Sequence, residues 1–197
     1  MHDRFSQFGL SQADINDDIK QVCDFFNIPM PWVDSRSHKC TKWSNHVCCW
    51  DRNSYNDDVL CLNMQQLIDM KVASKSAFSI VMTHECAQRV LQTTRFSGVN
   101  NGIWENELAA DFLRDAGLGF GTGMSLGVFV SVVTNGTPTH PDGSLRVLFI
   151  QHGKYVTKAM QSNGISLTIQ NLINEVTAFR EQNLADILRL ERRFYIF

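Results

Sequence analysis

The stretch THECAQR, residues 83–89, lies within a segment, Lys71–Thr93, whose apolar residues recur at helical spacing. Positions i and i+4 of a helix lie on one face, so the side chains of His84 and Gln88 point the same way, with Glu85 beside them. A His-Glu pair is also common on an ordinary solvated helix turn. The stretch therefore indicates a function only in combination with other motifs of the chain.

A second expected helix, Ile103–Gly117, carries two acids four residues apart, Glu107 and Asp111. A carboxylate from a second helix is the third ligand that a three-ligand zinc site needs. Another carboxylate one turn later can accept the spare N–H of a histidine ligand and orient its ring. Glu105 is a rival ligand, ranked lower because no acid follows it four residues later. The same acids would also suit a solvated helix face.

A third motif lies in the stretch THPDGSLR, residues 139–146, where His140 precedes a proline and Arg146 follows six residues later. With this motif the chain resembles the gluzincin metallopeptidases, especially the CAAX-prenyl endopeptidases and the minigluzincins. Those families carry His-Glu-x-x-His on one helix, Glu-x-x-x-Asp on a second, and His-Pro with an Arg six residues after the His. The resemblance covers roughly residues 59–150 and does not extend to the N-terminal third or the last helix.

The resemblance implies a zinc-dependent endopeptidase with one zinc ion per chain. His84, the residue at position 88 and Glu107 would be the metal ligands. Glu85 would take a proton from the metal-bound water and pass it to the leaving amine. Asp111 would orient His84. Peptides or proteins would be the substrates.

The resemblance also implies roles for residues outside the two helices. His140 would stabilise the oxyanion of the reaction intermediate, and Arg146 would hold that neighbourhood by pairing with an acid. Capping of a turn by His140 and an ordinary surface position for Arg146 are the plainer alternatives. The expected strand at residues 59–63 would be a sheet edge to which an extended substrate adds as a further strand. Its substrate-binding residues would be Leu60, Cys61 and Leu62.

Gln88 departs from the family pattern, because it stands where the second histidine ligand is expected. An amide oxygen is a poor substitute for imidazole at zinc, so we expect weak metal binding. Three explanations are open: a recent or engineered loss of a ligand, a natural pseudoenzyme that uses the scaffold for binding, or recruitment of another ligand. Cys86 is two residues from His84, on the wrong side of the helix, so recruitment ranks last.

A second group of possible metal ligands precedes the expected sheet. It comprises His38, Cys40, His46, Cys48 and Cys49. Residues i and i+2 of a strand share a face, so each His-x-Cys pair could bind one ion. The spacing fits no standard zinc module, however, and we favour a hairpin with buried thiols.

The chain has 197 residues, and we expect one domain over residues 1–197. We expect an α+β, mainly helical zincin-like fold with a small mixed β-sheet packed on the helix that bears His84. Gly119–Thr137 is glycine-rich and is a candidate lid. The expected helices are Ser11–Phe26, Lys71–Thr93, Ile103–Gly117, Gly143–Met160 and Ile165–Phe194, and the expected paired strands are His46–Trp50 and Val59–Asn63.

Composition excludes several classes of protein. The chain has 18 Lys and Arg against 20 Asp and Glu, a net charge of −2, which argues against a nucleic-acid partner. Its most apolar stretch, residues 119–133, is shorter than the ~20 residues of a membrane span. We see no signal peptide and expect the six cysteines to be free thiols, which favours the cytoplasm over export by a non-classical route. The oligomeric state is open.

Three hypotheses about function follow from these residues. We favour a soluble zinc-dependent endopeptidase of gluzincin type that is impaired or inactive because of Gln88. The second is a pseudo-peptidase that binds peptides or a protein partner without cleaving. The third is a structural or interaction protein in which the His-Glu pair is accidental.

Overall fold

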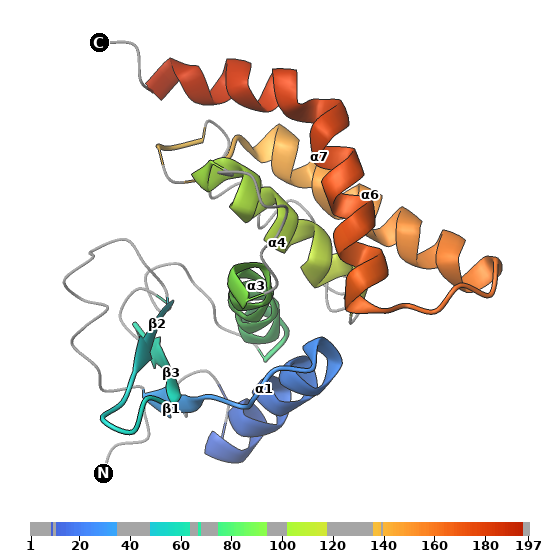
Figure 1. The fold of residues 1–197 in the computed structure, drawn as a ribbon. Coiled ribbons are helices and arrows are strands. Elements are labelled where there is room, and N and C mark those ends of the chain that lie inside the picture. The colour runs from blue at the N-terminus through green and yellow to red at the C-terminus, as the bar shows by residue number, and fades with distance from the viewer. Residues whose placement is uncertain are drawn as a thin grey trace. The chain divides into compact units, whose positions relative to one another are not determined.

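The computed structural model describes residues 9, 11–34, 48–63, 67, 75–93, 102–117, 136–138 and 140–194 (Figure 1). The chain divides into two compact units, Met1–Glu85 and Cys86–Phe197, which we describe one at a time. The expectation of a single domain stays a prediction. The fold is mainly helical with a small mixed sheet, consistent with the expected α+β class. No helix among the described residues is long and apolar enough to cross a membrane.

The first unit begins with helix α1, Gln12–Phe26, which the sequence predicted. Ser11 and Asp14 form a capping box: the Ser11 hydroxyl accepts from the Asp14 backbone N–H, and the Asp14 carboxylate accepts from that of Ser11. Asn27 ends the helix in the left-handed conformation, with a φ of 51°. The apolar face is buried and comprises Ile15, Ile19, Val22, Cys23 and Phe26.

The sheet of the first unit has three strands in the order β1-β3-β2. Strands β2, Cys48–Arg52, and β3, Asp58–Leu62, form the predicted antiparallel hairpin. Its turn is organised by Asn53, whose side-chain oxygen accepts from the backbone N–H groups of Tyr55 and Asp57, both at 2.9 Å. This turn fixes which residues of β2 and β3 pair with each other.

Strand β1, Trp32–Asp34, was not predicted, and it changes the interpretation of β3. It pairs in parallel with β3, on the side opposite to β2. Both hydrogen-bonding edges of β3 are therefore used within the sheet. The prediction that β3 offers an open edge to a peptide strand is therefore wrong at Leu60 and Cys61, which pair with Val33 and Asp34, and it stays a prediction at Leu62.

Helix α3, Lys75–Thr93, continues from the first unit into the second, and the boundary falls between Glu85 and Cys86. The expected first turn, residues 71–74, lies outside the described residues. Within the first unit, the indole N–H of Trp50 on β2 donates to the Glu85 backbone carbonyl at 3.2 Å. This bond ties the sheet to the part of α3 that bears the His-Glu pair.

The second unit also contains α4, Ile103–Gly117, α6, Gly143–Ser162, and α7, Ile169–Glu191, followed by a short 3-10 turn. Helix α4 packs against both α6 and α7 (Figure 1). The predicted helices are confirmed, although α7 begins four residues later than expected because the Thr168 side chain caps it by accepting from a backbone N–H. Most of the candidate lid, its residues 119–135, lies outside the described residues.

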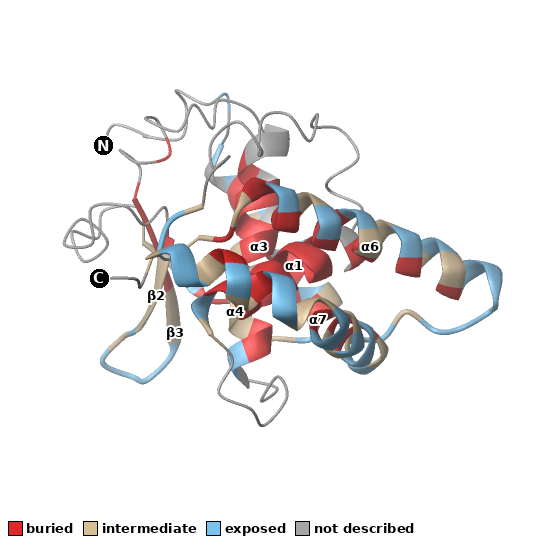
Figure 2. Cartoon of the chain, turned by 90° about the horizontal axis from the view of Figure 1, so that it is seen from above, coloured by how far each residue is buried: buried red, intermediate tan, exposed pale blue. Residues whose placement is uncertain are grey.

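Helices α4 and α6 approach each other closely at Gly153. A β-carbon at this position would lie 2.5 Å from the backbone oxygen of Phe112 on α4. One turn later, the Thr157 hydroxyl donates to the Ala116 backbone carbonyl at 2.6 Å. Buried and exposed residues alternate along α6, and its buried side includes Gly153 (Figure 2). The α4–α6 packing therefore depends on the absence of a side chain at this residue.

We predict that Gly153→Ala destabilises the protein, although an alanine in a helix is ordinarily more stable than a glycine by about 0.5–1 kcal/mol. The added methyl group would overlap Phe112 backbone atoms. We expect a net loss of about 1–3 kcal/mol in the free energy of unfolding, measured by urea titration. Gln151→Ala, at an exposed position of the same helix, is the control and should change stability little. Equal stability of both variants would contradict the close-approach interpretation.

Candidate functional site

Helix α3 bears three of the predicted site residues. His84 is buried with 7% exposure, whereas Glu85 and Gln88 are half-buried. All three belong to one helix, as predicted, with His84 and Gln88 one turn apart. That spacing places the two side chains on one helix face.

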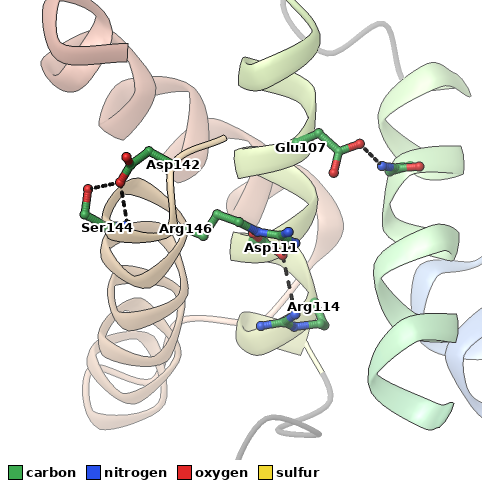
Figure 3. Close-up of polar contacts among 7 residues, drawn as sticks. Glu107, Asp111, Arg114, Asp142, Ser144 and Arg146 are labelled. Carbon is green, nitrogen blue, oxygen red and sulfur yellow. Dashed lines mark hydrogen bonds and ion pairs between the residues drawn. The ribbon is translucent and has the colours of Figure 1, made fainter. Parts of the chain in front are cut away.

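Gln88 and Glu107 meet across α3 and α4 within the second unit. The Gln88 side-chain N–H donates to a carboxylate oxygen of Glu107 (Figure 3). The structure thus brings together two positions that the family resemblance identifies as zinc ligands. In this chain they form an amide–carboxylate hydrogen bond.

Asp111 lies one turn after Glu107 on α4 and is completely buried. Arg146 on α6 binds it with two hydrogen bonds, from Nε at 2.6 Å and from Nη2 at 3.0 Å. Arg114 adds a contact at 3.4 Å (Figure 3). Burial acts to lower the pKa of Arg146, but the charge and hydrogen bonds of Asp111, together with the charge of Glu107, raise it overall.

Arg146 therefore pairs with an acid, as the sequence analysis expected, and the alternative of a surface cation is wrong. The position of Arg146 is set by the cap of α6, where the Asp142 carboxylate accepts from the backbone N–H and hydroxyl of Ser144 (Figure 3). Arg114 was missed, although its spacing of three residues from Asp111 was a visible signal. The role of Asp111 toward His84 stays a prediction.

Glu105, the rival ligand, has other partners. Its carboxylate accepts from the Gly102 backbone N–H at 3.1 Å, at the start of α4. It also forms a buried ion pair with Arg180 of α7, at 3.3 Å. Nothing in the sequence links Arg180 to Glu105, because the two residues are 75 positions apart. Glu105 is therefore engaged with Gly102 and Arg180, and Glu107 is the acid of α4 that contacts Gln88.

His140 lies in a tight turn that precedes α6. Its backbone forms a two-way bridge with Thr137, with N···O distances of 2.8 and 3.3 Å. The buried indole of Trp104 donates to the Thr137 carbonyl at 2.9 Å and anchors this turn to α4. The turn-forming role is thus present, and the role of His140 toward an oxyanion stays a prediction.

The second group of possible metal ligands is only partly described, since His38, Cys40 and His46 lie outside the described residues. Cys48 is a buried free thiol, and burial raises its pKa, with smaller contributions from Glu85 and Cys61. The buried thiol is consistent with the favoured interpretation of a hairpin with buried thiols. Cys49 is disulfide-bonded, which corrects the expectation that all cysteines are free.

In the part of the chain that the structure describes, the ligand set that the resemblance implies for zinc is incomplete, because position 88 supplies an amide. Among the described residues, no group of three or more His, Cys, Asp or Glu is placed to hold a metal ion. The Gln88 amide group donates to Glu107, whereas a metal needs lone pairs from both positions. Any metal would have to displace this hydrogen bond and accept a weak amide ligand.

We predict that Asp111→Asn strongly destabilises the protein. The substitution removes the negative charge that pairs with the buried guanidinium groups of Arg146 and Arg114, an effect of about 3–5 kcal/mol on the free energy of unfolding. Chemical denaturation measures the change. Asp186→Asn removes an exposed carboxylate paired with Arg189 and should alter stability by only about 0.5 kcal/mol. Similar losses in the two variants would refute a special role for the buried pair.

Comparisons with known proteins leave the family open. No protein-family profile matches the chain, and searches of curated proteins and of solved structures find no significant match. The resemblance to gluzincins therefore rests on the three sequence motifs alone.

Proposed function

We propose that this chain is a peptidase of the gluzincin type whose zinc site is impaired by Gln88. The observation that carries the proposal is the hydrogen bond between Gln88 and Glu107, the second and third predicted ligand positions. Residues 19 positions apart in the sequence are in contact at the place where the family motif requires contact. A chance His-Glu pair would not explain this pairing.

The buried ion pair beneath this contact supports the same proposal. Asp111 lies one turn after Glu107, so the two hydrogen bonds from Arg146 also restrain the helix turn that presents Glu107. In the proposed site this restraint fixes the carboxylate relative to α6 before any ligand binds. The ion pair thereby joins the Glu107–Asp111 motif on α4 to the motif that contains Arg146 on α6.

Gln88 accounts for the proposed impairment. A histidine at this position would offer a ring nitrogen lone pair to a metal, whereas the Gln88 amide group offers its N–H to Glu107. The carboxylate is thus engaged by a neutral donor. Because the amide side chain is of similar reach to an imidazole, we expect a histidine to be accommodated at position 88 without a change of fold.

A second candidate function is a protein that binds peptides or a partner without cleaving them. The same hydrogen bond favours it, because the Gln88 amide and the Glu107 carboxylate bind each other. The two candidates differ in what a histidine at position 88 would restore.

We predict that Gln88→His creates a zinc site and a zinc-dependent peptidase activity. The native chain, freed of metal and exposed to zinc, should retain far less than one ion per molecule, and the variant about one, as measured by elemental analysis. Cleavage of a mixed peptide library should appear only with the variant and be lost on chelation. Adding Glu85→Gln should abolish cleavage while zinc remains bound, because Glu85 would serve as the general base and would not be a ligand.

The matched control is Gln92→His, the same substitution at an exposed position one turn later on α3. It should gain neither zinc nor activity. If folded Gln88→His also binds no zinc, the three motifs do not form a metal site and the proposal is refuted. If the variant binds one zinc ion yet cleaves nothing, the non-cleaving binding protein is the better conclusion.

A further inference from the structure

A groove lies between α6 and α7, on residues that the proposed peptidase site does not use. It has a volume of about 390 Å³, within the range typical of small-molecule sites. Its walls come from the second half of α6, the turn that follows and the first two turns of α7. The residues that matter here are His152, Tyr155, Val156, Met160, Ile165 and Glu175, and we call this the α6–α7 groove.

The groove has an apolar interior and an exposed apolar rim. Val156 and Met160 are almost fully buried beneath it. Tyr155 and Ile165 line it as well, yet they are 66% and 48% exposed. A large aromatic ring and a branched aliphatic side chain thus remain in water beside the groove, where a ligand can cover them.

Among the described residues that line the groove, Glu175 is the only acidic or basic side chain apart from His152. It makes no ion pair or hydrogen bond with any residue that the structure describes, whereas other acids of the second unit, such as Asp111 and Asp186, are paired. The groove therefore presents one uncompensated negative charge at its α7 side.

His152 does not cancel this charge near neutral pH. Its ring stacks on Phe179, with centroids 3.7 Å apart and planes 10° from parallel. Burial lowers the pKa of His152, although Glu175 acts in the opposite direction. The imidazole is thus held as a neutral, stacked ring, and Glu175 determines the sign of the groove.

We propose that the α6–α7 groove binds an organic cation carried on an apolar stem, an alkylguanidinium or alkylammonium group such as the side chain of arginine or lysine. Glu175 supplies the opposite charge, and the ring of Tyr155 supplies a face for a cation–π contact. Val156 and Met160 would cover the methylene stem, as such stems are covered elsewhere in proteins. An anion would be repelled, and a purely apolar ligand would leave the carboxylate unused.

The proposal can be tested by NMR titration of the full chain with blocked arginine amide, and with blocked citrulline amide as its neutral isostere. We expect arginine to shift the ring signals of His152 and the side-chain amide signals of Asn174, both of which line the groove. Citrulline should shift them at least several-fold more weakly. Butylguanidinium, which has the cation and the apolar stem but no peptide backbone, is the third probe. If it binds as tightly as blocked arginine, the cation and stem are sufficient and the ligand can be a free small molecule. If it binds more weakly, the ligand is a peptide.

Variants identify the groups responsible. Glu175→Gln should weaken arginine binding about fivefold, the effect of one exposed charge pair, and Tyr155→Leu about threefold. Asp186→Asn, an exposed acid on the same helix, is the matched control and should leave binding unchanged. Unchanged circular dichroism would verify folding of each variant.

Three results would overturn the proposal. The first is the absence of shifts at His152 and Asn174 with arginine, and the second is equal binding of arginine and citrulline by the unmodified chain. The third is a set of concentration-dependent shifts of the same signals without any probe, which would show self-association through the groove. None of these results depends on the zinc experiment, because the groove and the Gln88–Glu107 contact share no residue.

Discussion

The buried ion pair between Asp111 and Arg146 is the interaction on which the second unit depends. A carboxylate with no exposed surface is stable as a charge only when it is paired and hydrogen-bonded, and Arg146 provides two bonds from α6. The geometry of such a bidentate pair is specific, so it sets how α4 and α6 meet. Close packing at Gly153 is compatible with that same arrangement.

The same ion pair restrains the helix turn that carries Glu107 in the proposed site. Glu107 lies one turn from Asp111, and its carboxylate accepts from Gln88 on α3. In the proposed site these contacts would position a metal ligand, and an amide stands where the family pattern has a second imidazole. A protein that lost one ligand but kept the surrounding restraints would have this arrangement, and so would one that uses the scaffold to bind without cleaving.

Much of the fold could be predicted because its signals are local. These signals depend on residues close together in the sequence. They are the Ser11–Asp14 capping box, the turn at Asn53 and the 3.6-residue periodicity of each helix. Strand β1 was missed because three residues carry too short a pattern, and this omission led to the wrong edge assignment for β3. At the site, an acidic partner for Arg146 could be expected, but its identity as Asp111, 35 residues earlier, could not.

The sequence by itself determined which segments are helical to within a few residues at their ends, and that the acids of α4 and the His-Glu pair of α3 lie on helices. These properties depend on residues within a few positions of one another. Only the tertiary structure decided that Gln88 contacts Glu107, that Glu105 pairs with Arg180, and that Glu175 lies in a groove with Tyr155. Such partners depend on how whole helices pack, and the free energy of packing is shared among many side chains distant in the sequence.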